Sequence, residues 1–173
     1  MPVAATQVVL RPMGECDVDA VRALDALVQP TPWSETFLRD QLTDTETRTL
    51  LVAEGADGAP VGHAVLVVVA DEGHVTSIAV DPAHQRRGIG ACLMAALCRD
   101  ARTRGLTSMT LEVRTSNTAA ISLYRRFGFA PAGVRPAYYT DADGTTTDAL
   151  VMWIHDVDDP AFDEQFEKAR VDG

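Results

Sequence analysis

Cysteine and histidine are scarce in this sequence. The three cysteines, Cys16, Cys92 and Cys98, are an odd number and show no C-x-x-C spacing, so neither a disulfide framework nor a zinc site is expected. The four histidines stand singly and form no pair at the spacing of metal ligands. We therefore expect no bound metal ion.

The sequence also lacks a long hydrophobic run. No stretch of 18 or more apolar residues occurs, and the apolar run at residues 64–70 has only the length of a strand. The first six residues carry neither the basic start nor the apolar core of a signal peptide. We expect a cytoplasmic protein that does not use a membrane as a partner.

Positive charge is the third shortage, and it is unevenly distributed. Lys and Arg number 15 against 25 Asp and Glu, and the net charge of −10 argues against nucleic acid as the main partner. Residues 156–173 hold seven acids and two bases, whereas residues 84–126 hold eight arginines and two acids. One basic block in an acidic chain fits a multiply phosphorylated ligand, while solubility explains the acidic tail equally well.

Length and composition favour one folded domain. The 173 residues, with 46% hydrophobic and 23% charged residues, are typical of a globular chain. There is no internal repeat or linker to mark a boundary. We assign residues 1–155 to a single domain and residues 156–173 to an acidic C-terminal extension that is not a separate domain. That extension is expected to be either a short helix or disordered.

Residues 75–129 carry the strongest pattern, which reads strand, loop, helix, strand, helix. The β-branched run at residues 76–80 stops at Asp81 and Pro82, because proline fixes φ and has no N–H to continue a strand. After the loop, apolar residues recur every three or four positions, as on one face of a helix: Ile89, Leu93, Met94, Leu97, Cys98 and Ala101.

Two glycines stand at the start of this helix. A helix N-terminus offers about four unpaired N–H groups and the positive end of the helix dipole. Gly88 and Gly90 have no side chain to keep an anion away from that backbone, and Arg86 and Arg87 add positive charge beside it. The stretch predicts a cradle for a phosphate or pyrophosphate, with a plain tight turn as the alternative.

Further elements are expected on both sides of this stretch. Helices are expected to begin at three capping residues, Asp17, Ser34 and Asn117. An antiparallel meander precedes the cradle helix, and a hairpin ends the domain. The expected strands are residues 8–12, 49–53, 61–70, 76–80, 107–114, 129–139 and 147–155.

The loop itself matches neither of two common phosphate-binding patterns. No Gly-Lys-Ser/Thr follows, as a Walker loop requires, and Leu93 stands where the dinucleotide fingerprint has its third glycine. Residues 85–90, which read Gln-Arg-Arg-Gly-Ile-Gly, instead resemble the acetyl-CoA loop of the GCN5-related N-acetyltransferases, Gln/Arg-x-x-Gly-x-Gly/Ala.

The flanking sequence extends this resemblance. Ile78-Ala79-Val80-Asp81-Pro82 precedes the loop. The string that follows it is similar to the bacterial ribosomal-protein alanine N-acetyltransferases: Leu111-Glu112-Val113-Arg114-x-Ser116-Asn117-x-x-Ala120-x-x-Leu123-Tyr124-x-x-x-Gly128-Phe129. The resemblance covers residues 75–139, has a second island at Pro32-Trp33-Ser34-Glu35, and is absent from residues 156–173.

The resemblance implies a mixed α/β (α+β) fold. In this fold, a largely antiparallel twisted sheet of about seven strands is flanked by about four helices. It also implies acetyl-CoA as co-substrate, facing backbone groups on an unpaired strand edge. The residues implied to hold it are Ile78, Ala79, Val80, Arg86, Arg87, Gly88, Ile89, Gly90, Ala91 and Asn117.

Amide formation from a thioester requires a neutral amine and a proton for the leaving thiolate. The resemblance assigns the base to Glu112 and the acid to Tyr124. Because glutamates titrate near ~4.3, a relay through water is favoured over direct abstraction from an ammonium group. From the residues alone, Glu112 has the alternatives of an ion pair with Arg114 or an exposed position, and Tyr124 that of a core tyrosine.

The acceptor is implied to lie near Trp33, Tyr138 and Tyr139. The alternative for Trp33 is that it packs against the core at the start of a helix. The alternative for the two tyrosines is that they pack on a strand. The resemblance points to direct acetylation of the N-terminal alanine of a small-subunit ribosomal protein. Pro136 departs from the family pattern and leaves acceptor choice less determined than donor choice.

The state of the amine also favours an N-terminal acceptor. At pH 7.5 an α-amine of pKa ~8 is roughly a quarter neutral, whereas a lysine of pKa ~10.4 is only about 0.1% neutral. Two alternatives stay open: acetylation of lysine side chains or small-molecule amines, and a CoA-binding module without catalysis. We expect a monomer or a weak dimer.

Overall fold

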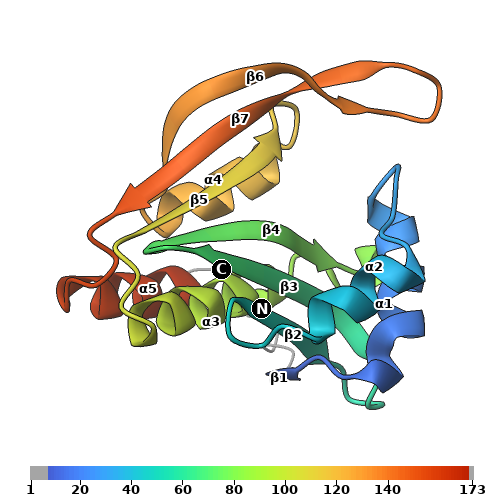
Figure 1. Cartoon of the computed structure of the whole chain (residues 1–173), viewed down its shortest axis with the longest axis horizontal. Helices are drawn as coiled ribbons and strands as arrows, with labels where there is room; N and C mark the ends of the chain where they lie inside the picture. Colours follow the sequence, from blue (N-terminus) through green and yellow to red (C-terminus); the bar gives the residue numbers. More distant parts are fainter. Residues whose placement is uncertain (1–7, 172–173) are drawn as a thin grey trace, which may run out of the picture.

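A seven-stranded sheet with the strand order β1-β2-β3-β4-β5-β7-β6 forms the centre of the fold (Figure 1). It is seen in a computed structural model that describes residues 8–171. The first six residues, where no signal peptide is expected, and the last two of the acidic extension lie outside the described residues. The strands are β1 (Val9–Pro12), β2 (Arg48–Glu54), β3 (Pro60–Val69), β4 (Glu72–Val80), β5 (Ser108–Arg114), β6 (Ala130–Thr140) and β7 (Thr146–His155).

The sheet is antiparallel except where β4 meets β5. Those two strands run parallel, and their pairing ends at Val75 and Leu111. β4 continues to Val80 and β5 to Arg114 beyond this last pair. The two strands therefore separate, and residues 76–80 of β4 form the open strand edge that was expected before the loop.

The described chain contains five α-helices, which cover both faces of this sheet (Figure 1). They are α1 (Val18–Val28), α2 (Glu35–Leu42), α3 (Ile89–Thr103), α4 (Thr118–Arg126) and α5 (Ala161–Val171). On one face, Val21 of α1 and Leu38 of α2 are buried in a cluster with Val52 and Val65 of the sheet. Within residues 8–171, none of these helices combines the length and apolarity needed to cross a membrane.

The larger core lies under α3, α4 and α5. Leu93 and Leu97 of α3 are fully buried in the same cluster as Leu111 of β5. Phe166 of α5 joins this cluster, and its ring stacks on Phe127 with 6.3 Å between centroids. Residues 161–171 of the acidic extension thus form a helix, α5, which is a fifth helix beyond the four or so expected.

Two of the three expected helix caps are confirmed. The side chains of Ser34 and Asn117 each accept a hydrogen bond from the backbone N–H three residues later. The side chain of Asp17 does not cap α1. Its buried carboxylate pairs with Arg11 at 2.7 Å, and this contact holds the pKa of Asp17 below its usual range. A guanidinium neutralises a buried carboxylate better than a helix N–H does, which explains the difference.

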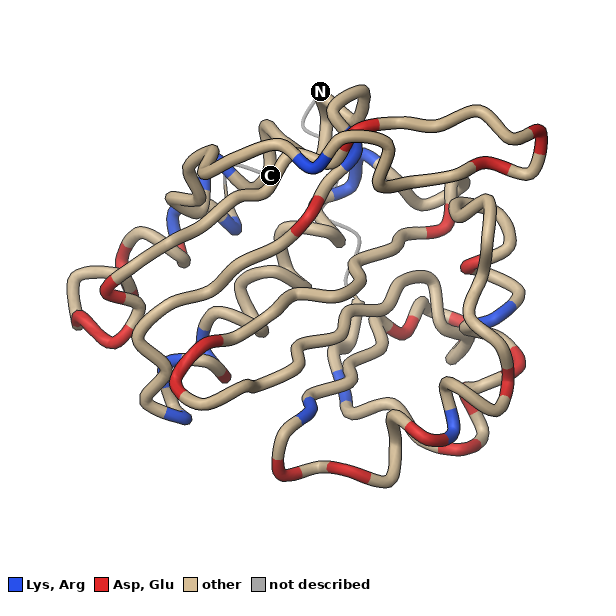
Figure 2. Tube along the Cα trace, turned by 45° about the horizontal axis from the view of Figure 1, so that its top comes forward, with Lys and Arg blue, Asp and Glu red and all other residues tan. Residues whose placement is uncertain are grey.

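The β6–β7 hairpin projects from the edge of the sheet, and its outer end reaches over the segment between α1 and α2 (Figure 1). Acidic residues occupy the turn at this outer end (Figure 2). The hairpin and its turn were expected from the sequence, and the pairing of β6 with β7 confirms them.

Candidate active site

A cleft of about 700 Å³ opens beside the N-terminus of α3, and we call it the loop cleft. Its walls come from the open edge of β4, the loop that follows β4, and α4. Most residues predicted to hold the co-substrate line it: Ile78, Val80, Arg86, Gly88, Ile89, Gly90, Ala91 and Asn117.

Two of the predicted residues do not line the loop cleft. Ala79 is buried in the core, because side chains alternate along a strand and residues 78 and 80 face the cleft. Arg87 is exposed on the surface of the loop. Conversely, the cleft wall includes His84, which the sequence did not single out, and Gln85, which begins the loop motif but was not predicted to hold the co-substrate.

The backbone of the loop favours an anion at this point. α3 begins at Ile89, so the N–H groups of its first turn have no acceptor within the helix. Gly88 precedes it with φ 78°, a left-handed conformation that glycine adopts without strain. Arg86 has φ 63°, which costs a non-glycine residue about 1–2 kcal/mol. Gln85 Nε2 donates to the carbonyl of Val80 at 3.0 Å and fastens this strained loop to β4.

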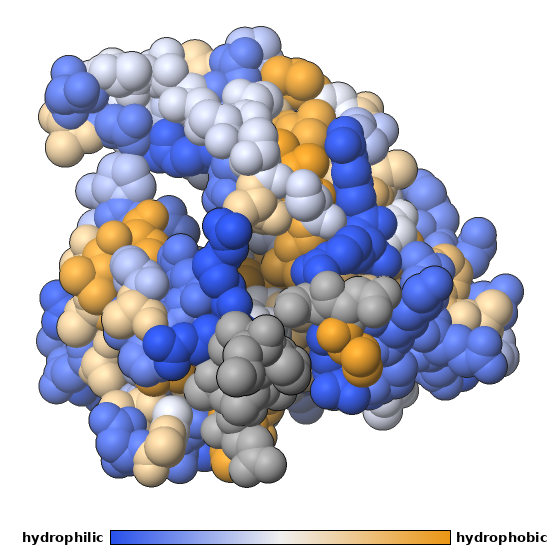
Figure 3. Space-filling model, turned by 180° about the vertical axis from the view of Figure 1, so that it is seen from behind, coloured by the Kyte–Doolittle hydropathy of each residue, from blue (hydrophilic) through white to orange (hydrophobic). Residues whose placement is uncertain are grey.

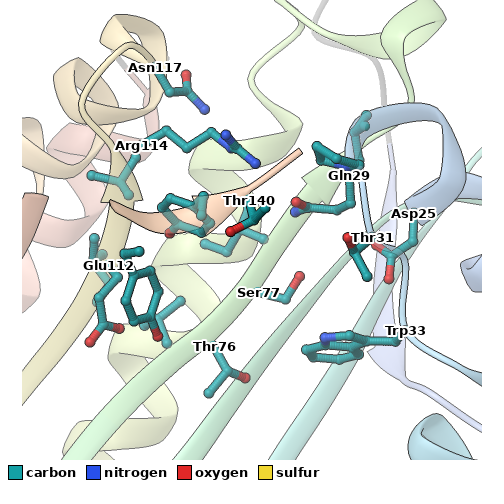
Figure 4. Close-up of a pocket in the computed structure, with 18 of the residues that line it drawn as sticks. Asp25, Gln29, Thr31, Trp33, Thr76, Ser77, Glu112, Arg114, Asn117 and Thr140 are labelled. Atoms are coloured by element: carbon teal, nitrogen blue, oxygen red, sulfur yellow. The ribbon is translucent and has the colours of Figure 1, made fainter. Parts of the chain in front are cut away.

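A second cleft, of about 390 Å³, lies beneath the β6–β7 hairpin, and we call it the hairpin cleft. Figure 4 shows Glu112 and Arg114 on one wall and Trp33 on the other, with β4 between them. Figure 3 shows, from behind, that the surface is open under the projecting hairpin. Tyr138 and Tyr139 line the same cleft, so all three residues predicted to contact an acceptor lie together.

The two clefts meet. Ile78, Asn117 and Tyr124 line both of them. Ile78 lies on the open edge of β4, while Asn117 caps α4 and Tyr124 lies within that helix. A ligand in the loop cleft and another in the hairpin cleft therefore come together at Tyr124. This geometry suits the transfer of a group between two substrates that enter from different sides.

Tyr124 is buried at this junction, with 8% of the residue exposed. Burial raises the pKa of Tyr124 to about 12, and the nearby Tyr139 contributes to the rise. The phenol therefore keeps its proton at neutral pH and is available as a proton donor. Its ring also packs 6.2 Å from that of Phe129, so Tyr124 is a core tyrosine as well.

Glu112 stands in the wall of the hairpin cleft with its side chain 10% exposed. Its Oε2 lies 2.6 Å from Nε2 of His74, and its Oε1 lies 3.3 Å from Nη2 of Arg135. The alternative ion pair with Arg114 is wrong. Arg114 stands at the outer end of β5, where it pairs instead with Asp141 of the hairpin turn at 2.8 Å.

Arg114 ties the hairpin to the sheet. Besides pairing with Asp141, its guanidinium lies over the ring of Tyr139, 4.5 Å from the centroid. A cation over an aromatic face is attracted by the ring quadrupole. Burial raises the pKa of Tyr139 to about 12, and Glu112 adds to the rise. Tyr139 is thus held in the cleft as a neutral phenol near Glu112.

The opposite wall rests on a buried pair. Nε2 of His63 lies 2.6 Å from Oδ1 of Asp25, and neither side chain is more than 2% exposed. The ring of Trp33 lies 6.3 Å from that of His63. Asp25 also lines the hairpin cleft. In the part of the chain that the structure describes, no group of three or more potential ligands could hold a metal ion.

Sequence reasoning missed His74 and Arg135 as neighbours of Glu112. His74 and Glu112 are 38 residues apart, and they meet because parallel pairing sets His74 beside Thr110 on β5. Arg135 comes from β6, on the far side of β7. Neither residue belongs to a motif, so the strand register was the one signal that could have found them.

Sequence comparison agrees with this architecture. Residues 18–129 match the family described as "Acetyltransferase (GNAT) family". The chain is 40% identical over 137 residues to a ribosomal protein bS18-alanine N-acetyltransferase of Salmonella typhimurium, spanning 79% of this chain and 89% of that protein. It is 32% identical over 149 residues to a Bacillus subtilis protein named a putative enzyme of the same type, spanning 86% and 96%.

Structural comparison gives the same result. The crystal structure of the ribosomal-protein-S18-alanine N-acetyltransferase from Escherichia coli superposes with a TM-score of 0.78 at 32% identity, covering 87% of this chain and 94% of that one. Arabidopsis thaliana NAA60, solved in complex with acetyl-CoA, shares the fold with a TM-score of 0.78 at 14% identity. The fold expected from the sequence is confirmed, and the chain belongs to the GNAT family of acetyltransferases.

Proposed function

We propose that this chain transfers the acetyl group of acetyl-CoA to the N-terminal α-amine of a protein. The N-terminal alanine of ribosomal protein bS18 is the first acceptor to test, because relatives that match most of the chain are named for it. The observation that carries the proposal is the meeting of two clefts at Tyr124, in the cleft wall that also holds Glu112. An acceptor of this kind implies action in the cytoplasm.

Acetyl-CoA fits the loop cleft by charge and by shape. Its pyrophosphate suits the N-terminus of α3, where Gly88 and Gly90 leave the backbone accessible and Arg86 adds positive charge. The open edge of β4 at Ile78 and Val80 offers backbone N–H and C=O groups to the amide-rich arm that carries the thioester. The thioester then lies toward the junction with the hairpin cleft.

The residues at the junction supply both proton transfers. Glu112 accepts the proton of the acceptor amine through a water molecule, and the amine nitrogen forms its bond to the acetyl carbon. The bond from that carbon to sulfur breaks, and the departing thiolate takes the proton of the Tyr124 hydroxyl. Tyr124 regains a proton from solvent, and Glu112 releases to solvent the proton that it accepted. No covalent bond to the enzyme forms in this route.

The hairpin cleft suits an extended peptide terminus. Tyr138 and Tyr139 form one side and Trp33 the other, so aromatic faces enclose the entering backbone. A base as mild as a glutamate with water matches an α-amine of pKa ~8 better than a lysine of pKa ~10.4.

A peptide assay tests the proposal. The chain is incubated with acetyl-CoA and a peptide that begins with the bS18 N-terminal sequence, and mass spectrometry follows a gain of one acetyl group. The matched control is the same peptide with its α-amine blocked and a lysine left free. We expect acetylation of the first peptide, and about a 10²-fold or larger fall in kcat for Glu112→Gln.

Two results would count against the proposal. Faster acetylation of the blocked lysine peptide would move the acceptor from an α-amine to a side chain. Unchanged turnover in Glu112→Gln, with acetyl-CoA binding intact, would remove Glu112 from the role of base.

A further inference from the structure

The carboxylate of Glu112 is held from behind by an imidazole. His74 Nε2 lies 2.6 Å from Glu112 Oε2, and the His74 side chain is 37% exposed against 10% for Glu112. Glu112 lines the hairpin cleft, whereas His74 is not among the residues that line it. The Glu112 carboxylate therefore lies between the cleft and the His74 imidazole, and the imidazole lies between that carboxylate and solvent.

The short contact fixes the position of one proton. Two lone pairs do not approach to 2.6 Å, so a hydrogen lies between the nitrogen and the oxygen. An ionised carboxylate has acceptors only, and Nε2 of His74 is then the donor. The imidazole thus directs Oε2 away from the cleft and leaves Oε1 as the oxygen that a water in the cleft can reach.

The second partner of Glu112 is looser. Nη2 of Arg135 lies 3.3 Å from Oε1, and the Arg135 side chain is 57% exposed. The same guanidinium lies 5.6 Å from the centroid of Tyr138. A long exposed side chain gains little from an ion pair, so it leaves easily. The water molecule that bridges to the acceptor amine takes the place of Arg135 on Oε1, while the hydrogen bond of His74 to Oε2 persists.

The backbone around this pair is rigid. His74 pairs with Val67 of β3 on one side and with Thr110 of β5 on the other. Glu112 pairs with Val151 of β7. His74 sits where β4 and β5 are still paired, and Glu112 directly follows Leu111, the last residue of β5 in that pairing. Strand positions hold a side chain more precisely than loop positions do.

We propose that His74 is the positioning residue for Glu112, which it holds in the orientation that accepts the acceptor's proton. This inference rests on the proposed function, because it assigns His74 a part in the same reaction. His74 touches neither substrate. Its removal frees the carboxylate to rotate toward Arg135, so the relay to the amine is misaligned while both clefts keep their shape.

Three substitutions separate this role from a structural one. His74→Ala removes the donor, and we expect kcat to fall about 10-fold or more with the KM for acetyl-CoA unchanged. His74→Gln keeps an N–H donor on a shorter side chain and restores at least part of the lost rate. His74→Phe keeps the bulk of the ring without the donor, and it serves as the deleted-donor variant if His74→Ala does not fold. His155→Gln, at the far end of β7, is the matched control.

A double-mutant cycle gives the decisive result. If His74 acts through Glu112, His74→Ala has no further effect on kcat in a Glu112→Gln background, because the group it orients is already lost. The inference would be overturned if the two substitutions reduced kcat independently, so that their fold-changes multiplied in the double mutant. Equal kcat values for His74→Gln and His74→Phe would overturn it as well.

If wild type acetylates the peptide and Glu112→Gln is slow while His74→Ala is not, the inference fails and the proposed function stands. If neither wild type nor any variant acetylates an amine, the proposed function fails and takes the inference with it.

Discussion

The loop cleft and the hairpin cleft are built in different ways. The lining residues of the loop cleft fall within two segments, 78–91 and 117–126, and include the glycines at the N-terminus of α3. The hairpin cleft is made of side chains from segments that run from Asp25 to Thr140. Its walls are held by side-chain contacts between distant segments, such as the ion pair of Arg114 with Asp141 and the hydrogen bond of Glu112 with His74.

The difference assigns a separate task to each region. A backbone cradle at a helix N-terminus recognises an anion without depending on any one side chain. Such a cradle suits a co-substrate that is the same in every reaction, whatever the acceptor. A cleft walled by side chains changes its selectivity when single residues change. We infer that donor binding depends mainly on chain geometry in this protein, and acceptor choice on the contacts of the hairpin.

Tyr124→Phe is expected to have the largest effect, because this residue belongs to both clefts. Loss of the hydroxyl removes the proton donor for the leaving thiolate, so we expect kcat to fall about 10²- to 10³-fold. The KM values for acetyl-CoA and peptide change little, since the ring stays in place beside Phe129. Steady-state kinetics with both substrates measure this, and a raised KM with normal kcat would make Tyr124 a binding residue instead.

The loop cleft was largely predictable from the sequence, and the reason is local. The strand residues 76–80 and the loop residues Arg86, Arg87, Gly88 and Gly90 lie within 15 residues, so these neighbours in the chain are neighbours in space. Arg87 and Ala79 are the exceptions. Composition could not tell which arginine faces the cleft, because that depends on the left-handed backbone at Arg86.

The hairpin cleft was predictable only in part. Trp33, Tyr138 and Tyr139 came from the family resemblance, and all three line the cleft. The partners of Glu112 could not be found, because they depend on the register between strands that are distant in the sequence. The helical state of the acidic extension was left open for a similar reason: Phe166 becomes a core residue only when α3 and Phe127 are in place.

The loss of stability at alkaline pH is expected to differ between Tyr124, at the buried junction of the clefts, and Tyr139, in the hairpin cleft. Tyrosines in an unfolded chain titrate near ~10, whereas the folded pKa of Tyr124 is about 12. Between these values the unfolded state loses a proton that the folded state keeps, so stability present below pH 10 is lost as pH rises. The loss from Tyr124 approaches about 2.7 kcal/mol across that window.

Urea unfolding at pH 9 and at pH 11.5 measures this loss. Tyr124→Phe is expected to lose clearly less stability between the two pH values than wild type. Tyr139→Phe is expected to differ less from wild type, because Tyr139 is more exposed and solvent screens its ionised form. A larger effect from Tyr139 than from Tyr124 would reverse the assignment of the buried junction.

Arg114→Ala is expected to affect only the hairpin cleft. The change removes the ion pair with Asp141 and the cation over Tyr139, so the hairpin is held less firmly against β5. We expect the KM for the peptide to rise about 10-fold, the equivalent of about 1.4 kcal/mol, with the KM for acetyl-CoA unchanged. Arg99→Ala, which breaks an exposed pair with Glu167 between α3 and α5, is the matched control and should alter neither KM.

The smallest expected effect is a difference in the KM for acetyl-CoA between alanine variants of the two loop arginines, Arg86 and Arg87. Arg86 lines the loop cleft and Arg87 does not, although no sequence pattern ranks one above the other. An exposed charge contact contributes about 0.2–1 kcal/mol, so we expect Arg86→Ala to raise the KM for acetyl-CoA about 3-fold at low salt and Arg87→Ala to change it much less. Alanine keeps the Cβ atom, so the left-handed backbone strain at position 86 is the same in both proteins. The difference should shrink as salt is added, because screening weakens exposed charges. Equal shifts for the two variants would mean that both arginines contribute through the general field of the loop rather than by their place in the cleft.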